Sequence, residues 1–188
     1  MKLLIAGLVV FLGIHLLPLM PAVRTLFAGF LGENRYKGLF SIVAGLGLAM
    51  IVWGYAIAPR GEQLFAPSML ARELAPYAMA LSFVLLAAAN MRSHIRRTLK
   101  HPMLAGIGVW ALTHLLANGH ERATLLFAAF LAYVALDLGS VMARGSVKQF
   151  EPLRKHDVIA IGGGIGLALL VMLFHRIIFG VAPVAWSL

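Results

Sequence analysis

Residues 39–58 read LFSIVAGLGLAMIVWGYAIA and contain no charged side chain. A helix of this length is about 30 Å long, at 1.5 Å per residue, which equals the thickness of the hydrocarbon core of a bilayer. A helix on the surface of a water-soluble domain instead presents one apolar and one polar face. The stretch therefore predicts a helix that spans a membrane.

The composition of the whole chain agrees with this prediction. Of its 188 residues, 61% are hydrophobic and 12% are charged, and none is cysteine. A soluble domain is more polar, a disordered chain is less hydrophobic, and a secreted disulfide scaffold needs cysteines. These classes are excluded, and the chain is predicted to be an all-α integral membrane protein.

Apolar runs separated by helix breakers predict a bundle of about six transmembrane helices. Their approximate bounds are residues 2–20, 39–58, 74–91, 102–118, 123–143 and 157–181. Pro59, Pro102 and Gly119 lie at the ends of these runs, where helices commonly begin or end. No gap between the runs is long enough for a second domain, so residues 1–188 are expected to form a single transmembrane domain.

The first run is expected to remain as a span, although Lys2 and the apolar residues after it imitate a signal peptide. The segment around Pro21 lacks the small residue that a cleavage site has three positions earlier, and His15 interrupts the apolar run. Arg24, soon after the run, suits an anchor on the cytoplasmic side.

Lysine and arginine are unevenly distributed between the two ends of the predicted helices. One side holds Arg24, Arg35, Lys37, Arg92, Arg96, Arg97, Lys100, Arg144, Lys148, Arg154 and Lys155, and the other holds Lys2, Arg60, Arg72 and Arg122. Cytoplasmic loops of membrane proteins carry the excess of these residues. The basic loops are therefore predicted to face the cytoplasm, and both termini to face the periplasm or its equivalent.

The net charge of +9 lies mostly in the loops, and we expect these loops to contact the lipid bilayer. No basic helix, aromatic RNA-binding motif or zinc pattern accompanies the charge. Nucleic acid is not an expected partner. Residues 162–166, GGGIG, lie inside an apolar run without a preceding strand, so close helix packing through Gly162 and Gly166 is expected rather than phosphate binding. No grouping of residues supports a hydrolase or a zinc enzyme.

Polar side chains inside the predicted helices are costly to place in lipid and mark candidate functional positions. They are His15, Asn90, Thr113, His114, Asp137, Ser140, His175 and Arg176. Several of them lie near helix ends, where a side chain reaches the headgroups or caps a terminus. His15 lies about 8 to 10 Å and His114 about 18 Å from the predicted cytoplasmic surface, so these are the two deepest histidines.

A neutral imidazole in lipid is a metal ligand, a proton-relay group or a hydrogen-bonded packing residue. For His15 and His114 together, axial ligation of a haem is the most economical single explanation, because haem offers two axial sites and an apolar ring that helices enclose. Their depths differ by about 8 to 10 Å, so a shared iron requires a steeply inclined axis or a tilted helix. Packing without a cofactor stays open for each of them.

Asp137 is a candidate partner of the predicted iron ligand His15, because the two residues lie at a similar depth in the predicted membrane. A hydrogen bond from the distal ring nitrogen of His15 to Asp137 would fix the tautomer and the basicity of the ligand. A pairing of Asp137 with Arg144, or contact with interfacial water, is an equally good explanation.

The loop of residues 92–101 supplies further candidates. Arg96 and Arg97 are expected to meet anionic lipid headgroups, and a haem propionate is the alternative partner because arginine binds carboxylates in a bidentate way. His101 directly precedes Pro102 and is expected to be a helix-entry residue more than an iron ligand. Thirteen residues separate it from His114, so the two point in well-separated directions around a helix.

Short motifs along the chain resemble the NnrU family. They are His15 with Pro18 and Arg24, Gly32-Glu33 with Tyr36 and Phe40-Ser41, Gly54-Tyr55 with Ala58-Pro59, residues 100–106 (KHPMLAG) and residues 110–119 (WALTHLLANG). Their order and spacing carry the resemblance over most of residues 1–140. The family consists of multi-pass bacterial membrane proteins linked to denitrification, that is, to nitrite and nitric oxide reduction.

The resemblance extends to the plant 15-cis-zeta-carotene isomerase, a membrane enzyme with haem b. Its axial histidines lie in segments similar to those around His15 and His114, so the resemblance implies haem b with two histidine ligands and a location in the bacterial inner membrane. A cysteine three residues before the second histidine of the plant enzyme is replaced here by Ala111. Lys100 stands where the family usually has arginine, which keeps the charge and loses the bidentate geometry.

Three functional hypotheses follow. The first is a haem b protein that supports denitrification by electron transfer, redox sensing or assembly of a reductase, with respiratory membrane proteins as partners. The second is a haem-dependent cis-trans isomerase of a carotenoid-like polyene, which Ala111 disfavours. The third is a membrane interaction protein without cofactor, in which the two histidines form hydrogen bonds between helices.

Overall fold

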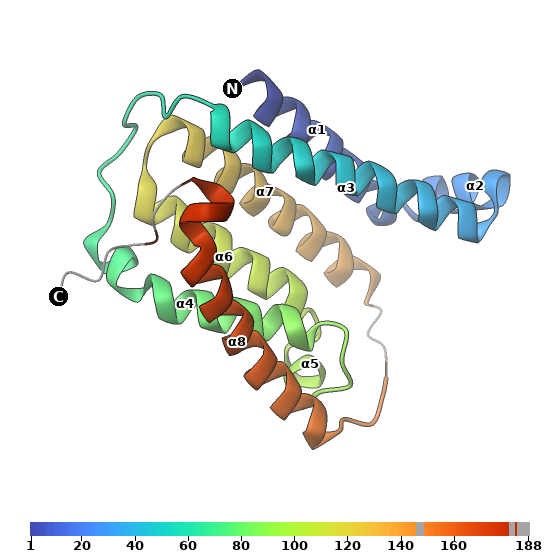
Figure 1. Ribbon diagram of the computed structural model, residues 1–188. Coiled ribbons are helices and arrows are strands. Elements are labelled where there is room, and N and C mark those ends of the chain that lie inside the picture. The colour runs from blue at the N-terminus through green and yellow to red at the C-terminus, as the bar shows by residue number, and fades with distance from the viewer. Residues whose placement is uncertain (146–148, 181–182, 184–188) are drawn as a thin grey trace. The chain divides into compact units, whose positions relative to one another are not determined.

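A computed structural model describes residues 1–145, 149–180 and 183. By its internal contacts the chain divides into two compact units, Met1–Gly61 and Glu62–Leu188, called the first and the second unit. Two predicted positions, Lys148 in a basic loop and Val181 at the end of the sixth apolar run, lie outside the described residues. The elements are labelled in Figure 1.

The first unit is made of helices separated by tight breaks. Their bounds are α1 Lys2–Leu16, η1 (a 3-10 helix) Leu17–Leu19, α2 Pro21–Leu31 and α3 Glu33–Ile57. Pro18 and Pro21 stand in the first turn of η1 and α2, where a helix needs no N–H donor from them. Gly32 adopts φ +81°, a value that glycine reaches without strain, and the chain turns there from α2 into α3.

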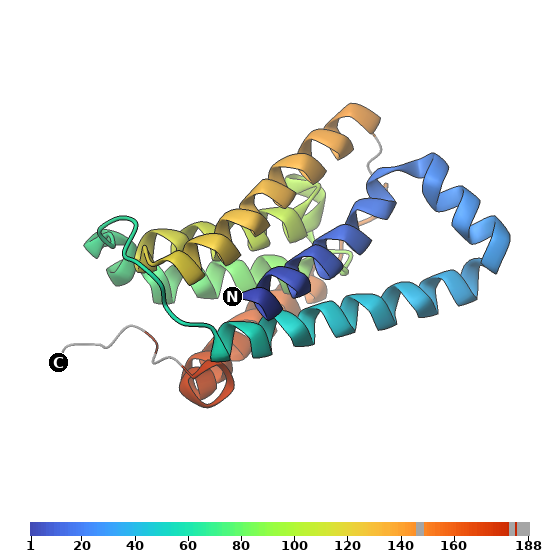
Figure 2. The same cartoon turned by 90° about the horizontal axis from the view of Figure 1, so that it is seen from above.

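Glycines allow α1 and α3 to pack backbone against backbone. A Cβ atom at Gly54 would lie 2.5 Å from the backbone nitrogen of Leu4, and one at Gly47 would lie 2.8 Å from that of Phe11. No larger residue fits at either position without moving a helix. Figures 1 and 2 both show the two helices side by side. This packing holds the last turn of α1, which carries His15, against α3.

The second unit contains the remaining helices. Their bounds are α4 Met69–Ala88, α5 His94–Leu99, α6 Pro102–Asn118, α7 Glu121–Arg144 and α8 Arg154–Phe179. α4 packs against both α6 and α8, and α6 also packs against α7. A buried hydrogen bond of 2.8 Å from the Ser82 hydroxyl to the Gly106 carbonyl joins α4 to α6. In Figure 2, α6 and α7 run alongside each other as a hairpin.

The glycine run of α8 packs against α4, but through a different face from the predicted one. A Cβ atom at Gly164 would lie 2.5 Å from the backbone of α4, and Ala160 and Ala168, one turn away on either side, are buried. Gly162 and Gly166 have nothing within 4 Å of an added Cβ atom. The prediction of close packing at this run is confirmed, and the prediction that Gly162 and Gly166 form the contact is wrong.

Loops tie the helices of the second unit together at one end. The Leu64 amide donates to the Gly119 carbonyl at 2.9 Å, and the Ser68 amide donates to the Leu116 carbonyl at 2.8 Å. Gly119 itself adopts φ +76°, and an added Cβ atom there would collide with the Phe65 carbonyl. The segment before α4 is thereby fixed to the turn between α6 and α7.

A second set of hydrogen bonds joins the segment after α4 to the start of α8. The Leu153 amide donates to the Arg92 carbonyl at 2.8 Å, and the Arg92 amide donates to Nδ1 of His156 at 3.0 Å. Nδ1 of His94 lies 2.6 Å from Oδ2 of Asp157. The two ends of α4 are therefore held by separate polar networks, one in each loop region.

The predicted all-α membrane fold is confirmed for the described part of the chain. Five segments are long and apolar enough to cross a membrane: Lys2–Leu19, α3, α4, α7 and α8. α6 matches the predicted run 102–118 but is a shorter apolar helix of 17 residues. These helices agree with the prediction of about six spans.

Some helix bounds differ from the apolar runs. α3 begins at Glu33, six residues before the run 39–58, because Gly32 ends the previous helix and polar residues continue α3 outside the apolar segment. α4 begins at Met69 because the Ser68 hydroxyl accepts a hydrogen bond from the Ala71 amide and caps the helix. The short helices α2 and α5 were not predicted.

Candidate functional histidines

His15 lies in the last turn of α1 and is half-buried. Its ring nitrogen Nδ1 is 2.6 Å from the carbonyl oxygen of Phe11, one helical turn earlier. The imidazole ring also contacts two aromatic rings, with centroids 4.3 Å away for Phe11 and 5.2 Å away for Phe40 of α3. The side chain is therefore held by its own helix and by the helix packed against it.

His114 lies in α6 and has the same local geometry. Its Nδ1 is 2.9 Å from the carbonyl oxygen of Trp110, again one turn earlier. The ring centroid is 4.9 Å from that of Phe127 in α7 and 5.5 Å from that of Trp110. Trp110 in turn contacts Phe127 and Phe130 edge-on, so the histidine stands in a cluster of aromatic rings from two helices.

The hydrogen bonds decide which ring nitrogen of each histidine carries the proton. A carbonyl oxygen only accepts, so Nδ1 of His15 and of His114 must each donate an N–H. In the neutral imidazole the lone pair then belongs to Nε2, the atom that binds a metal in this tautomer. A hydrogen bond from the other nitrogen also orients the ring and raises its basicity as a ligand. In both histidines the hydrogen bond therefore assigns the proton to Nδ1 and the lone pair to Nε2.

Neighbouring groups support the position of His114. The side-chain amide of Asn118 donates to the His114 carbonyl at 2.7 Å, which holds the end of α6. Ala111, the position at which the plant enzyme has cysteine, has an exposed fraction of 0% and is an inert methyl group within the helix packing. The rings of Trp110 and Phe127 cover part of the His114 imidazole and shield that part from water.

Asp137 lies in α7 and is half-buried. Its Oδ2 accepts a hydrogen bond of 3.2 Å from the hydroxyl of Tyr133, one turn earlier on the same helix. The carboxylate therefore has a donor within its own helix, which the sequence pattern did not single out. The predicted bond between Asp137 and His15 stays a prediction.

The remaining candidates lie in α5 and at the start of α6. His101 is the N-terminal cap residue of α6, directly before Pro102, so its prediction as a helix-entry residue is confirmed. Arg96 and Arg97 belong to α5, and the Arg96 guanidinium lies 5.3 Å from the centre of the Phe150 ring. His114 is twelve residues after Pro102, or about 18 Å along α6. The structure thus does not bring these arginines together with His114.

The sequence analysis did not single out three further residues: Trp110 and Phe127, which contact His114, and the buried Arg122. Trp110 could have been found, because it stands four residues before His114 and therefore on the same helix face. Phe127 is found only once α6 and α7 are known to form a hairpin. Arg122 has an exposed fraction of only 7%, yet an arginine directly after a turn looks like an ordinary loop residue in the sequence.

The fold and these histidines define a multi-pass helical membrane protein with two half-buried imidazoles of the same tautomer. In the described ranges, no three His, Asp or Glu side chains gather in a group able to hold a metal ion. The chain belongs to the NnrU family, whose model matches residues 3–183. The resemblance found in the sequence is thereby confirmed and extends over nearly the whole chain. No curated protein and no solved structure matches it.

Proposed function

We propose that this NnrU protein binds haem b and that His15 and His114 would hold its iron. The observation that supports the proposal is the shared hydrogen bond from Nδ1 to the carbonyl one turn earlier, which leaves Nε2 as the ligating atom in both residues. Haem needs only two ligands from the protein, so a third neighbouring His, Asp or Glu is not required. Each of the two imidazoles is therefore a suitable donor for haem iron.

The proposed biological role is support of denitrification, through electron transfer, redox sensing or assembly of a reductase. Bound haem b would supply reversible one-electron chemistry, tuned by its axial ligands and their hydrogen bonds. The residues of the chain would orient and shield it. The carbonyls of Phe11 and Trp110 fix the two imidazoles, and the rings of Phe127 and Phe40 limit the access of water. A strain lacking the protein should then reduce nitrite or nitric oxide more slowly.

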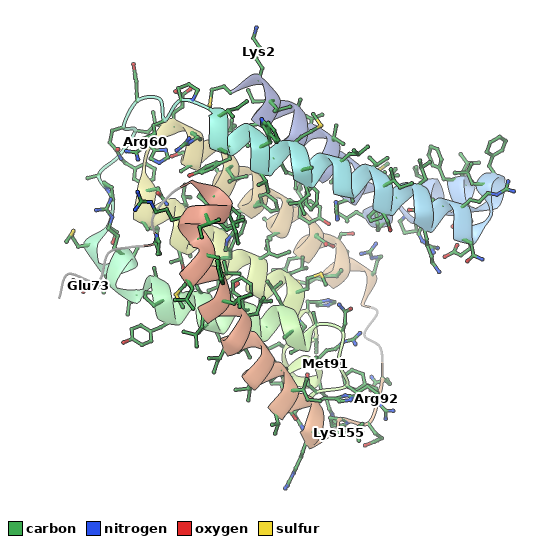
Figure 3. The ribbon with its side chains drawn as sticks, in the orientation of Figure 1. Lys2, Arg60, Glu73, Met91, Arg92 and Lys155 are labelled. Atoms are coloured by element: carbon green, nitrogen blue, oxygen red, sulfur yellow. The ribbon has the colours of Figure 1, made fainter. Side chains whose placement is uncertain are left out.

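We also propose that the protein lies in the bacterial inner membrane with its basic end in the cytoplasm. Arg92, Arg96, Arg97, Lys100, Arg154 and Lys155 all belong to the segments that join α4, α5, α6 and α8 at one end of the second unit. Figure 3 shows Arg92 and Lys155 at this end and Glu73 at the other. The positive-inside rule supports this orientation. A reporter active only in the cytoplasm should therefore be inactive when fused after residue 188.

The ligand assignment is tested by absorption spectra of the protein purified in mild detergent, first oxidised and then reduced with dithionite. Wild type should contain six-coordinate low-spin haem b. His15→Ala and His114→Ala should each lose the haem or convert it to a five-coordinate form. His94→Ala, a change at an exposed histidine whose ring contacts Asp157 at the other end of the second unit, is the matched control and should leave the spectrum unchanged. Colourless wild-type protein, even after expression with haem precursor, would refute the proposal.

A further inference from the structure

α2 is a short helix that presents large apolar side chains outward. It spans 11 residues, or about 16 Å, which is too short to cross a bilayer. None of its residues is buried. The exposed fractions are 71% for Leu26, 44% for Phe27 and 88% for Phe30. These three positions share one face of the helix, so α2 carries a continuous apolar surface that the rest of the first unit does not cover.

The opposite side of α2 is attached to α3 by a charged contact. The guanidinium of Arg24 donates to Oε1 of Glu33 at 2.7 Å and lies 5.8 Å from the centre of the Tyr36 ring. Oε1 of Glu33 also lies 3.2 Å from Nζ of Lys37. α2 therefore packs against the first turns of α3. The depth of α2 relative to a bilayer is then set by the depth of those turns.

The first turns of α3 mark the boundary of the membrane. Because α1 and α3 are antiparallel and Gly47 contacts Phe11, the end of α1 at Leu16 is level with about residue 42 of α3. The apolar run of α3 begins at Leu39, and the residues before it are mostly charged or polar. The hydrocarbon core therefore ends near the start of that run, and α2 lies beside it at the level of the headgroups.

Charge around α2 matches an anionic lipid surface. Arg24, Arg35 and Lys37 are basic and Glu33 is the only acidic residue of the segment 20–38, so this part of the chain is net positive. Helices that lie in the bilayer interface combine basic residues with an opposite face of Phe, Leu or Trp. If this face lay in water, exposure of the apolar surface of its phenylalanines would cost free energy.

We propose that α2 is an interfacial helix whose Leu26, Phe27 and Phe30 insert at the boundary between headgroups and acyl chains of an anionic bilayer. Its partner is the phospholipid surface itself. Arg24, Arg35 and Lys37 make this part of the chain net positive, which favours contact with the lipid phosphate groups. This inference does not depend on haem.

The chain contains no cysteine, so single cysteines can be introduced and spin-labelled without background. The test uses the full chain in vesicles of phosphatidylethanolamine and phosphatidylglycerol, with labels at Phe30→Cys or Leu26→Cys. The matched control is Thr25→Cys, an exposed position about 140° around the helix from Phe30. All three side chains are exposed, so the substitutions leave the packing unchanged.

Electron paramagnetic resonance then measures the collision of each label with oxygen, which concentrates in lipid, and with a water-soluble nickel chelate. Labels at positions 26 and 30 should collide mainly with oxygen, and the label at position 25 mainly with the chelate. If positions 26 and 30 collide with the chelate as strongly as position 25, the face lies in water and the proposal is wrong. If neither reagent reaches them, a protein surface or a second copy of the chain covers the face, and the proposal is equally overturned.

Discussion

The two units hold their helices together by different means. In the first unit, α1 and α3 approach so closely that glycine is required at the contact, and the missing side chains create the interface. In the second unit, loops at both ends of α4 are joined to neighbouring helices by hydrogen bonds. Packing in the first unit therefore depends on the close fit of two helix backbones. Packing in the second unit depends also on hydrogen bonds between loops and helices. Close glycine contacts occur in both units, as at Gly164 of α8, so the contrast lies in the added hydrogen bonds of the second unit, which loop and hydroxyl substitutions test.

Both units nevertheless hold a histidine ring in the same way. The hydrogen bond from Nδ1 to the carbonyl one turn earlier is local to α1 in one case and to α6 in the other. The tautomer is therefore set by the helix and is independent of how the helix is packed. The neighbouring rings differ, with Phe40 beside His15 and Phe127 beside His114.

The largest effect is expected at the glycine contact of the first unit. Gly54→Ala places a methyl group 2.5 Å from the backbone of α1 and should lower the free energy of unfolding by about 3 kcal/mol, because neither backbone can yield. The midpoint of unfolding by sodium dodecyl sulfate, added to dodecyl maltoside micelles, measures the change.

Gly45→Ala is the matched control for this substitution, since it lies in the same helix with nothing within 4 Å of the added atom. It should raise the free energy of unfolding by up to about 1 kcal/mol through helix propensity. Equal midpoints for the two variants would show that α1 and α3 do not depend on the close contact.

An intermediate effect is expected at the loop of the second unit. Gly119→Ala combines a left-handed backbone with a collision against the Phe65 carbonyl, and should cost about 2 to 3 kcal/mol. Gly145→Ala has a similar backbone, φ +60°, but open space around it, and should cost only about 1 kcal/mol. The same detergent titration compares them. A difference near zero would argue against the attachment of residues 62–68 to the turn before α7.

The smallest effect is expected for the buried hydroxyl between α4 and α6. Ser82→Ala removes the donor to the Gly106 carbonyl and should cost about 0.6 kcal/mol, the average for such bonds between membrane helices. Ser41→Ala, at an exposed position of α3, should be neutral within error. A neutral Ser82 variant would mean that this buried hydrogen bond does not stabilise the contact of α4 with α6, and would restrict the contrast between the units to the loop hydrogen bonds.

The class of fold could be predicted because long apolar runs have few solutions in a bilayer. Their ends were less predictable, since hydropathy marks where lipid ends and not where a helix ends. α3 continues through Glu33, Arg35 and Lys37 beyond its apolar run for this reason. α2 was missed because an apolar stretch of 11 residues is too short to span a bilayer, and Pro21 and Gly32 at its two ends are typical of a loop.

The register of helix contacts could not be predicted from spacing alone. The run at residues 162–166 contains several glycines, and only the position of α4 selects Gly164 as the one in contact. The candidate site shows the same limit. His15 and His114 follow from depth in the sequence, and their tautomers follow from the helix, whereas Phe127 and the bond between Tyr133 and Asp137 require the folded chain.

Rescue by free imidazole tests the central claim most directly, because it separates an iron ligand from a residue that merely packs. His15→Ala and His114→Ala protein is purified with haem precursor supplied, and its spectrum is recorded before and after imidazole is added. We expect imidazole to restore the six-coordinate low-spin spectrum of wild type in both variants. A low-spin spectrum that either variant already has without imidazole, at the haem content of wild type, would contradict ligation by that histidine.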